Sequence, residues 1–497
     1  MTRTPRPLFG TAGSLALAAG VAVTLACAGG AGVAPGAGTA ASAGLTGFDS
    51  ALVGRILLAE DRRDSAGTAL SEGAAHPDVR IRMLAQRARG RIRDPKFAAR
   101  DSLPAWRATV SWPEPAWRLR YRALAGRRTD CGVLRGALDD SVPAVRLRAA
   151  SLVTATCAAD EALASTLRGW VDALPADASR RSAGGVSWHA AAHGAVALAR
   201  LRPAEARARM RALGDHRQWQ VRLYAARAAA VLSDTVALRA LARDANDNVK
   251  ESAIEALASL TPADHEIFVE ALGAQGPQVV RAAAIALKGT SNVRAAAAAN
   301  AAFERWVARA NASERDARVA LLAAAGRPAS DDRPPAARHE LPPRIVALAL
   351  GADVRLRVHM APSSGGGSFT VRLRGDVAPM MAARILALVQ RGYYDRNDWH
   401  RVEHDFVIQG GGPGSNEYVG LSHFLRDELG ALPHVRGTVG MSTRGHDTGD
   451  AQWFINLKDN LRLGPDYTVF AEVVDGMDVV DGVMEGDVIS RIEEVSP

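Results

Sequence analysis

The chain has 497 residues, 48% of them apolar, so it can bury several cores and is not a wholly disordered protein. Its formal charge of +8 would suit a nucleic-acid partner, but only four of the 61 basic residues are lysine, and alanine is abundant, which is typical of a biased coding background. Residues 344–497 hold 15 basic and 21 acidic residues, whereas residues 1–343 carry a net charge of +14. We therefore expect two regions of opposite charge that attract each other, and no nucleic-acid partner.

The N-terminus has the features of an export signal. Arg3 and Arg6 precede an apolar run at residues 15–26, which is too short to cross a bilayer as a stable helix. Cys27 follows the run, and residues 24–27 resemble a bacterial lipobox, in which the cysteine is acylated; ordinary cleavage after residues 41–43 is the alternative. We predict a signal peptide or lipoprotein signal at residues 1–27 and an Ala/Gly-rich tether at residues 28–44. In both cases the protein is expected to be exported to the periplasm, and in the lipoprotein case it touches the membrane through a lipid anchor on Cys27.

Residues 45–326 carry a repeated helical pattern. Residues 115–120 (Pro-Ala-Trp-Arg-Leu-Arg) recur 28 residues later as residues 143–148 (Pro-Ala-Val-Arg-Leu-Arg). A step of valine followed by a basic residue marks further copies, at Val79, Val221, Val249 and Val280. Each copy begins an amphipathic helix with one apolar face, and the basic residue is predicted to face water. The pattern resembles HEAT-type repeats, which stack into an all-α solenoid that acts either as a partner-binding surface or as a spacer.

Two pairs of residues in this array suggest specific chemistry. Cys131 lies near the start of one helix and Cys157 near the end of its antiparallel neighbour, so in an exported protein we expect a disulfide; two buried free thiols are the alternative. His189 and His193 have the spacing of a metal-binding pair, but no carboxylate stands at a matching position. We therefore expect packing residues there, no metal site and no cofactor.

A second domain follows a Pro-rich linker at residues 327–344, because the apolar period changes there from helical to two. Alternation over residues 354–360 and 369–373 predicts half-buried strands, and residues 378–391 predict a helix. Further short strands are expected at residues 406–409, 438–441, 453–456, 468–474 and 488–495. Many short strands with few helices predict a compact β-barrel or sandwich over residues 345–497.

Several motifs of this domain resemble the cyclophilin signature. They are Trp399-His400-Arg401-Val402, Asp405–Gly411, Arg436–Met441, Gln452–Ile455 and Tyr467–Phe470. The resemblance covers about residues 354–495, and it implies a closed eight-stranded antiparallel β-barrel with two capping helices. It also implies peptidyl-prolyl cis–trans isomerase activity on proline-containing polypeptides. The chain as a whole is thus predicted to be multidomain, with a HEAT-like solenoid followed by a cyclophilin-like barrel.

The resemblance also implies the residues of the site. X–Pro isomerisation is slow because of amide resonance, so a catalyst must stabilise the twisted amide, in which the prolyl nitrogen regains its lone pair. Arg401 matches the catalytic arginine of the family, and Gln409 matches the glutamine that positions it. The positions that match substrate-binding residues are Phe406, Val407, Thr443, Gln452, Phe454, Leu463 and Tyr467.

Two functions of different classes remain open. The first is an exported foldase whose solenoid binds client or partner proteins. The second is a scaffold that binds proline-containing segments and isomerises them slowly or not at all. Arg462 stands where many relatives carry tryptophan, which implies weak inhibition by cyclosporin, and this change together with Asp450 favours the second function. Retention of Arg401 and the residues around it favours the first.

Overall fold

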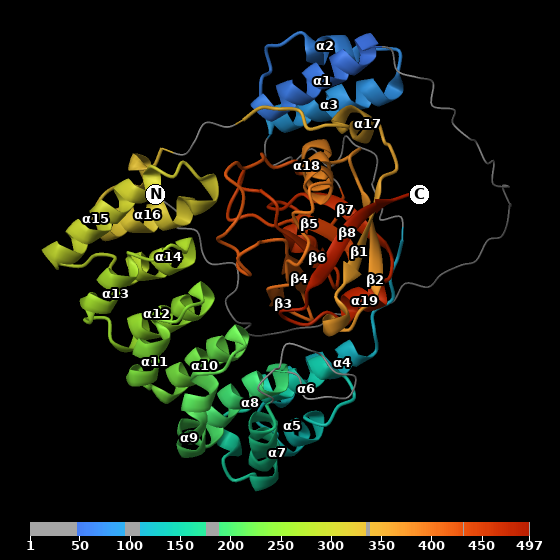
Figure 1. Ribbon diagram of the computed structural model, residues 1–497. Coiled ribbons are helices and arrows are strands. Elements are labelled where there is room, and N and C mark those ends of the chain that lie inside the picture. Colours follow the sequence, from blue (N-terminus) through green and yellow to red (C-terminus); the bar gives the residue numbers. More distant parts are fainter. Residues whose placement is uncertain (1–46, 95–109, 175–187, 334–337, 431, 497) are drawn as a thin grey trace, which may run out of the picture. The chain divides into compact units, whose positions relative to one another are not determined.

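The computed structural model describes residues 47–94, 110–174, 188–333, 338–430 and 432–496 (Figure 1). The signal peptide and tether predicted at residues 1–44, including the candidate lipidation residue Cys27, lie outside the described residues. Within the described residues, none of the helices combines the length and the apolar character needed to cross a bilayer.

Three helices come first, α1 (Gly47–Arg62), α2 (Ala69–Ala74) and α3 (Val79–Arg93). Their buried apolar residues, such as Ile56 and Ile81, belong to the same hydrophobic cluster as α17 (Ile345–Ala349) and the interior of the C-terminal sheet. A buried ion pair adds to this contact, because Arg91 of α3 pairs with Glu60 and also donates to the carbonyl of Leu429. These helices therefore share a core with the sheet.

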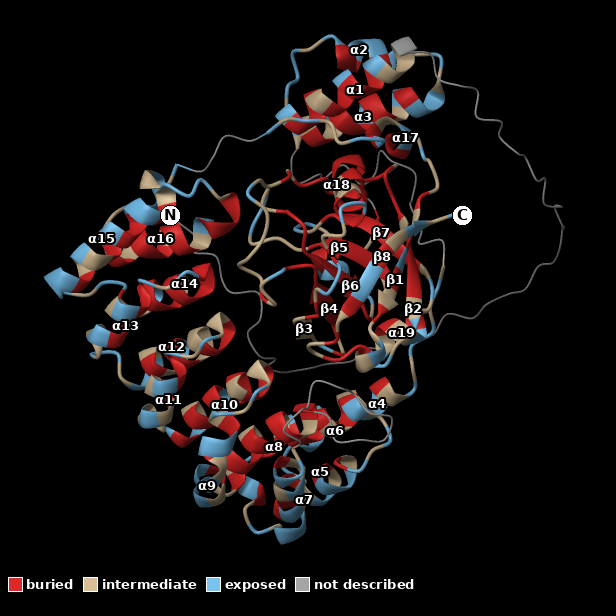
Figure 2. Ribbon diagram, in the orientation of Figure 1, coloured by how far each residue is buried: buried red, intermediate tan, exposed pale blue. Residues whose placement is uncertain are grey.

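The next helices stack in sequence order and confirm the helical N-terminal region (Figure 1). They are α4 (Trp117–Ala123), α5 (Cys131–Ala137), α6 (Pro143–Leu152), α7 (Glu161–Asp172), α8 (Trp188–Leu201), α9 (Pro203–Gly214), α10 (Trp219–Leu232), α11 (Thr235–Leu241), α12 (Asp247–Leu260), α13 (His265–Ala271), α14 (Pro277–Ala286), α15 (Val293–Val307) and α16 (Arg315–Ala324). The even-numbered helices α6 to α16 contact one another in succession, and α5–α7, α9–α11 and α13–α15 pair beside them. Figure 2 shows buried residues on the facing sides of the stacked helices.

The repeated sequence step explains how each repeat is held. The valines of four copies, Val145, Val221, Val249 and Val280, are at most 1% exposed. The prediction that the basic residue faces water was wrong for Arg118 of the copy at residues 115–120, which is completely buried. Arg146 and Arg222 are partly exposed, and each donates to the carbonyls five and six residues earlier, in the preceding turn. Arg82 makes the same two bonds, so the copy in α3 begins at Ile81, and Val79 is 54% exposed. The arginine thus stabilises the turn before its own helix through these hydrogen bonds.

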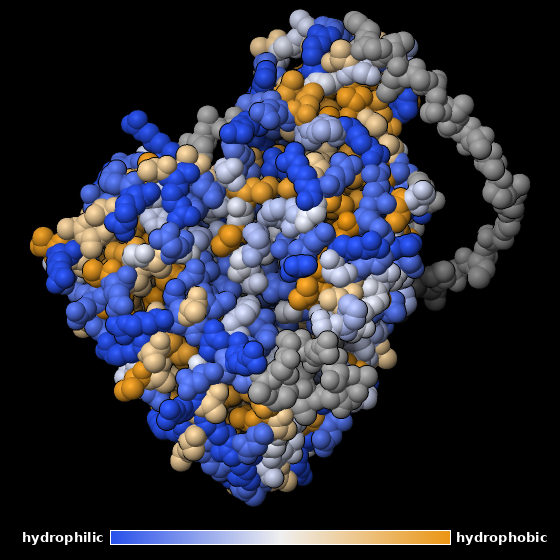
Figure 3. All heavy atoms as spheres, viewed as in Figure 1, coloured by the Kyte–Doolittle hydropathy of each residue, from blue (hydrophilic) through white to orange (hydrophobic). Residues whose placement is uncertain are grey.

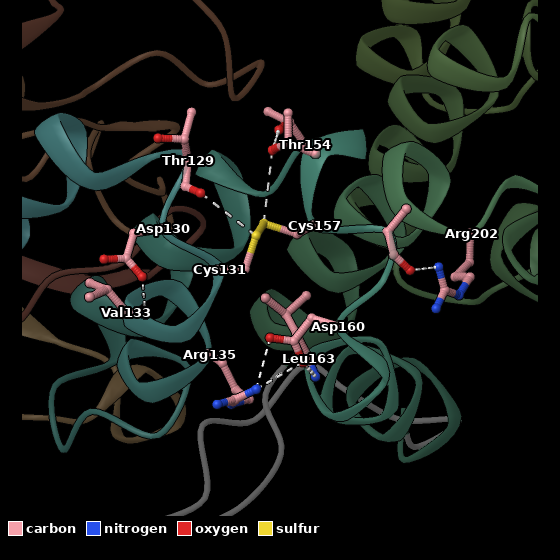
Figure 4. Close-up of a disulfide and its surroundings, with 12 residues drawn as sticks. Thr129, Asp130, Cys131, Val133, Arg135, Thr154, Cys157, Asp160, Leu163 and Arg202 are labelled. Carbon is pink, nitrogen blue, oxygen red and sulfur yellow. Dashed lines mark hydrogen bonds and ion pairs between the residues drawn. A yellow bond between two sulfur atoms is a disulfide. The ribbon is translucent and has the colours of Figure 1, made fainter.

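Cys131 and Cys157 form a disulfide with a Cα–Cα distance of 5.5 Å (Figure 4). Cys131 is the first residue of α5, and Cys157 ends a short 3-10 helix that follows α6. Beside them Arg135 pairs with Asp160, whose carboxylate also caps α7 (Figure 4). The disulfide and this ion pair join α5 to the segment between α6 and α7, which is the pairing that the repeat pattern predicted.

The C-terminal region is an eight-stranded antiparallel sheet with the order β3-β4-β6-β5-β7-β2-β1-β8. Its strands are β1 (Arg355–Met360), β2 (Ser368–Leu373), β3 (Arg401–Val402), β4 (Val407–Gly410), β5 (Thr438–Met441), β6 (Trp453–Asn456), β7 (Val469–Asp475) and β8 (Ile489–Val495). The alternation in the sequence places Leu356, Val358 and Met360 in the core. Helix α18 (Pro379–Val389) packs against β7 and β8, and the short helix α19 (Met477–Asp481) packs against β2.

The prediction of a closed barrel was wrong, because the curled sheet is open between its edge strands β3 and β8. β3 has only two residues and is too short to form a ladder with β8. The backbone just before each edge strand takes its place: Trp399 N–H donates to the Asp487 carbonyl and Gly486 N–H donates to the Trp399 carbonyl, both at 2.9 Å. A short edge strand therefore leaves a half-barrel that irregular backbone completes.

Polar contacts join the helical array to the sheet. Tyr224 of α10 donates to the Glu485 carboxylate at 2.7 Å, and Asn416 donates to the side chain of Asn248 at 3.0 Å. His189 and His193 take part here rather than in a metal site: His189 lies 2.6 Å from the Glu485 carbonyl and His193 bonds Tyr224. No group of three candidate metal ligands occurs among the residues that the structure describes.

Candidate active site

Arg401 begins a hydrogen-bond network that runs from β3 and β4 to the residue after β5 and the residue before β6. It is paired with Gln409 across the β3–β4 ladder, and its Nη1 donates to Gln409 Oε1 at 3.1 Å. Gln409 Nε2 in turn donates to Ser442 Oγ at 3.0 Å and approaches Gln452 Oε1 at 3.5 Å. The second Nη of Arg401 pairs with Glu403. These contacts fix the direction of the guanidinium, and the Arg401 side chain remains 23% exposed.

An apolar cluster stands beside this guanidinium. Its buried members are Phe406, Val407, Phe454 and Leu463, with Tyr467 packed against them. The guanidinium carbon of Arg401 lies 5.8 Å from the centroid of the Phe406 ring, and the Tyr467 ring meets Phe454 edge-on at 5.6 Å. Burial raises the pKa of Tyr467 to about 12, so its phenol is neutral and can donate a hydrogen bond at any physiological pH. The site thus combines a fixed cation with an apolar surface.

Gly440 and Ser442, which our sequence reasoning missed, shape this cluster from β5 and its end. Gly440 lies opposite Phe454, and a Cβ there would stand 2.4 Å from Phe454 Cζ. Only glycine therefore leaves room for the ring in its present place. Ser442 receives the hydrogen bond from Gln409. Neither residue type signals chemistry by itself, and the position of Gly440 inside the 436–441 motif was the only indication in the sequence.

His434 is a third residue that sequence reasoning missed. Its ring stacks on Phe454 with centroids 5.7 Å apart. Its Nε2–H donates to the Tyr467 carbonyl at 2.9 Å, and Asn456 Nδ2 donates to its Nδ1 at 3.2 Å, which requires the neutral tautomer. Burial lowers the pKa of His434 to about 4, in agreement with this network. The neutral imidazole thus packs against the Phe454 ring and helps to hold it in place.

Gln452 and Thr443, two of the predicted substrate-binding residues, lie at the ends of strands beside the site. Gln452 is 2% exposed, and its amide donates to the carbonyls of Asn416 and Val419 at 3.1 and 3.2 Å. It therefore connects the Arg401 network to the 416–419 loop. Thr443 is half-buried directly after Ser442, beyond the end of β5.

The structure shows what two residues that depart from the family pattern, Arg462 and Asp450, contact. Arg462 holds its guanidinium carbon 5.0 Å from the Phe406 ring centroid, so it covers part of the apolar cluster. Asp450 accepts a hydrogen bond from Leu421 N–H at 3.1 Å and thereby fixes the 420–421 backbone. Asp450 acts on a loop, whereas Arg462 contacts the site itself.

The sheet and this arginine–glutamine–aromatic site define a domain of the prolyl-isomerase class. Residues 357–495 match the family model described as cyclophilin type peptidyl-prolyl cis-trans isomerase/CLD. A peptidyl-prolyl cis-trans isomerase of Helicobacter pylori is 32% identical over 130 residues, which are 25% of this chain and 80% of that protein. Peptidyl-prolyl cis-trans isomerase B of Escherichia coli is 37% identical over 128 residues, covering 24% of this chain and 78% of that protein.

Among solved structures, a cyclophilin type isomerase of Cryptosporidium parvum covers 29% of this chain and 99% of its own, at 22% identity and a TM-score of 0.28. The chain belongs to the cyclophilin-type peptidyl-prolyl cis–trans isomerase family, and its isomerase domain is the C-terminal region.

Proposed function

We propose that this chain accelerates cis–trans isomerisation of X–Pro bonds in polypeptide clients, with Arg401 as the catalytic group. The observation that carries the proposal is the Arg401 guanidinium, fixed by Gln409 and Glu403 beside the apolar cluster. The cluster offers a surface for the proline ring, and the guanidinium stands next to it, where the prolyl nitrogen would lie.

The reaction explains why this arrangement suffices. The barrier of about 18–20 kcal/mol comes from amide resonance, and no bond to another atom is made or broken. When the amide twists, the prolyl nitrogen regains a lone pair, and a fixed N–H donor with positive charge stabilises that state more than the planar one. Arginine suits this role because it stays protonated even in a partly apolar site. Gln409 keeps the guanidinium in one direction, so little reorganisation is needed during the twist.

Arg401→Ala in the full chain tests this proposal. Loss of one preorganised donor is expected to lower kcat/KM for a proline peptide about 10²- to 10³-fold. Arg491→Ala is the matched control, because Arg491 is an exposed arginine on β8 that pairs with Glu493. Wild-type turnover in Arg401→Ala would overturn the proposed role of Arg401. Tight peptide binding without turnover in the wild type would instead support the scaffold function.

We also propose that the protein is exported. The Cys131–Cys157 disulfide supports this proposal, since disulfides persist in oxidising compartments and are rare in the cytosol. Fractionation of producing cells, followed by thiol titration of the unreduced protein, tests it. Recovery in the periplasmic or membrane fraction is expected, with Cys131 and Cys157 unreactive. Recovery in the cytosol with both thiols reactive would contradict it.

The helical array is proposed to hold a client or partner on its outer surface. Large apolar residues are exposed there on separate helices, including Leu119 of α4, Val236 of α11 and Val293 of α15. On the face shown in Figure 3 such residues are scattered among hydrophilic ones. Crosslinking of the full chain to an unfolded, proline-containing client, followed by identification of the crosslinked residues, tests this role. Crosslinks confined to the sheet domain would oppose it.

A further inference from the structure

We propose that α4 of the helical array is a positioning element of the isomerase site, because its side chains hold the turn that carries Glu403 and Phe406. This inference rests on the proposed function of that site. The turn, residues 403–406, joins β3 to β4, follows Arg401 in sequence and contains Phe406 of the apolar cluster. Helix α4 lies far from it in sequence, outside the part of the chain that matches the family model.

Arg118 makes the central contact. Its side chain is completely buried, and its Nε donates to the His404 carbonyl at 2.9 Å. Its Nη1 donates to the Leu457 carbonyl at 2.5 Å and its Nη2 pairs with Asp481 at 2.7 Å. One guanidinium therefore bridges the 403–406 turn, the residue after β6 and helix α19. A planar fork of donors suits three partners in different directions, which a lysine could not reach together.

These carbonyls are close to the groups that matter for catalysis. Within the turn, Phe406 N–H donates to the Glu403 carbonyl at 2.7 Å, so His404 lies inside a closed loop. Leu457 N–H donates to the Phe406 carbonyl at 3.0 Å. Arg118 thus fixes the backbone directly beside both anchors of Phe406. A shift of the turn would move the Phe406 ring within the apolar cluster. It would also move Glu403, the ion-pair partner of Arg401.

A second line of contacts comes from the same side of α4. Arg122 Nε pairs with Asp405 at 2.6 Å, and the rings of Trp117 and Tyr121 meet His404 edge-on at 6.0 and 6.1 Å. Residues 117 and 121, like 118 and 122, are four apart and therefore share one side of the helix. Side chains of α4 thus contact two successive residues of the turn, His404 and Asp405.

The residues between them face away from the turn. Arg120 pairs with Asp140 inside the array, and Leu119 is 66% exposed. Arg436 independently donates to the Leu457 carbonyl and pairs with Asp481, so both keep a partner when Arg118 is changed. The effect of such a change should therefore concentrate on the turn at His404. Arg120 offers a control arginine on the same helix.

The test compares Arg122→Ala and Arg118→Lys with Arg120→Ala in the full chain. Arg122 is 34% exposed and Asp405 keeps its contact with Lys458, so Arg122→Ala is expected to fold. We expect Arg122→Ala and Arg118→Lys to lower kcat/KM for a proline peptide roughly tenfold or more, since displacements near 1 Å cost up to about a hundredfold. Arg120→Ala should retain the wild-type value.

A second readout separates positioning from stability. The protein is labelled with 4-fluorophenylalanine, and the Phe406 signal is assigned from Phe406→Leu. We expect a shifted or broadened Phe406 fluorine resonance in Arg122→Ala and an unchanged one in Arg120→Ala. A merely structural role would lower the melting temperature and leave this resonance and kcat/KM of the folded protein unchanged, which would overturn the inference. Equal losses in Arg120→Ala would also overturn it. An inactive wild type would refute the proposed function alone, and the fluorine signal would still decide the inference.

Discussion

Gly440→Ala should damage the active site without altering any residue that carries chemistry. The added Cβ would lie 2.4, 2.8 and 2.9 Å from three atoms of the Phe454 ring, whereas ordinary contacts begin near 3.4 Å. The ring must therefore move by about 1 Å. It cannot swing away freely, because His434 stacks on one side and Tyr467 meets it edge-on. Gly440 is not among the glycines with positive φ, so alanine adds no backbone strain and the contact alone acts.

The expected cost follows from this displacement. Overpacking a buried site destabilises by about 1–3 kcal/mol, and a displacement near 1 Å at a binding surface lowers kcat/KM by roughly ten- to a hundredfold. A protease-coupled proline-peptide assay gives kcat and KM, and a thermal melt reports stability. Gly482→Ala is the control, because its nearest atoms would lie at 3.5 Å. Wild-type kcat/KM in folded Gly440→Ala would refute the argument that Phe454 must stay where it is.

Three further predictions concern the disulfide, histidine protonation and Arg462. Replacing both Cys131 and Cys157 by serine opens a link of sequence separation 26 and should lower the free energy of unfolding by up to about 3–4 kcal/mol in urea titrations, with isomerase activity retained. Burial lowers the pKa of His434 to about 4 and of His193 and His400 to about 3, so the unfolded chain binds more protons below its histidine pKa of about 6.5. The contribution of these histidines to stability should be fully present above about pH 7 and be lost as the pH drops toward 4. Buried carboxylates whose pKa is raised, such as Glu428 at about 7, act in the opposite direction, so the test compares slopes: His434→Gln should make the loss of stability toward low pH shallower than in the wild type in urea titrations at several pH values, and an unchanged slope would contradict this. Arg462→Trp should strengthen inhibition by cyclosporin in the isomerase assay, because tryptophan restores the aromatic rim of the family; equal inhibition of both proteins would count against this.

Local pattern was enough to predict much of the fold and of the site. The period-two alternation predicted β1 and β2 because one face of each is buried, and the helical period predicted the stacked helices. The repeat register also predicted that Cys131 and Cys157 meet, because it makes their helices antiparallel neighbours. The family motifs led to Arg401, Gln409, Phe406 and Phe454, which lie around one site. Their catalytic roles stay predictions until they are tested.

Other features depend on contacts between distant segments, which periodicity does not encode. The open edge of the sheet follows from the two-residue strand β3, whose pattern is too short to recognise. Arg146 was expected to face water, and only the turn before α6 shows what it bonds. The repeat step predicted that Arg118 faces water, but it is completely buried and donates to the His404 carbonyl, whereas Arg120 on the same helix pairs with Asp140 of the array.

The sequence by itself determined the class of each region, the opposite charges of the two regions and the chemical groups of the site, because each is written in local spacing and residue type. The tertiary structure decided how these groups are held. It placed Gly440 and His434 around Phe454, and it brought a buried arginine of the helical array onto the turn of the isomerase domain. The physical reason is that a side chain's partners depend on packing between segments hundreds of residues apart, and an arginine has the same sequence signal whether it bonds water or a buried carbonyl.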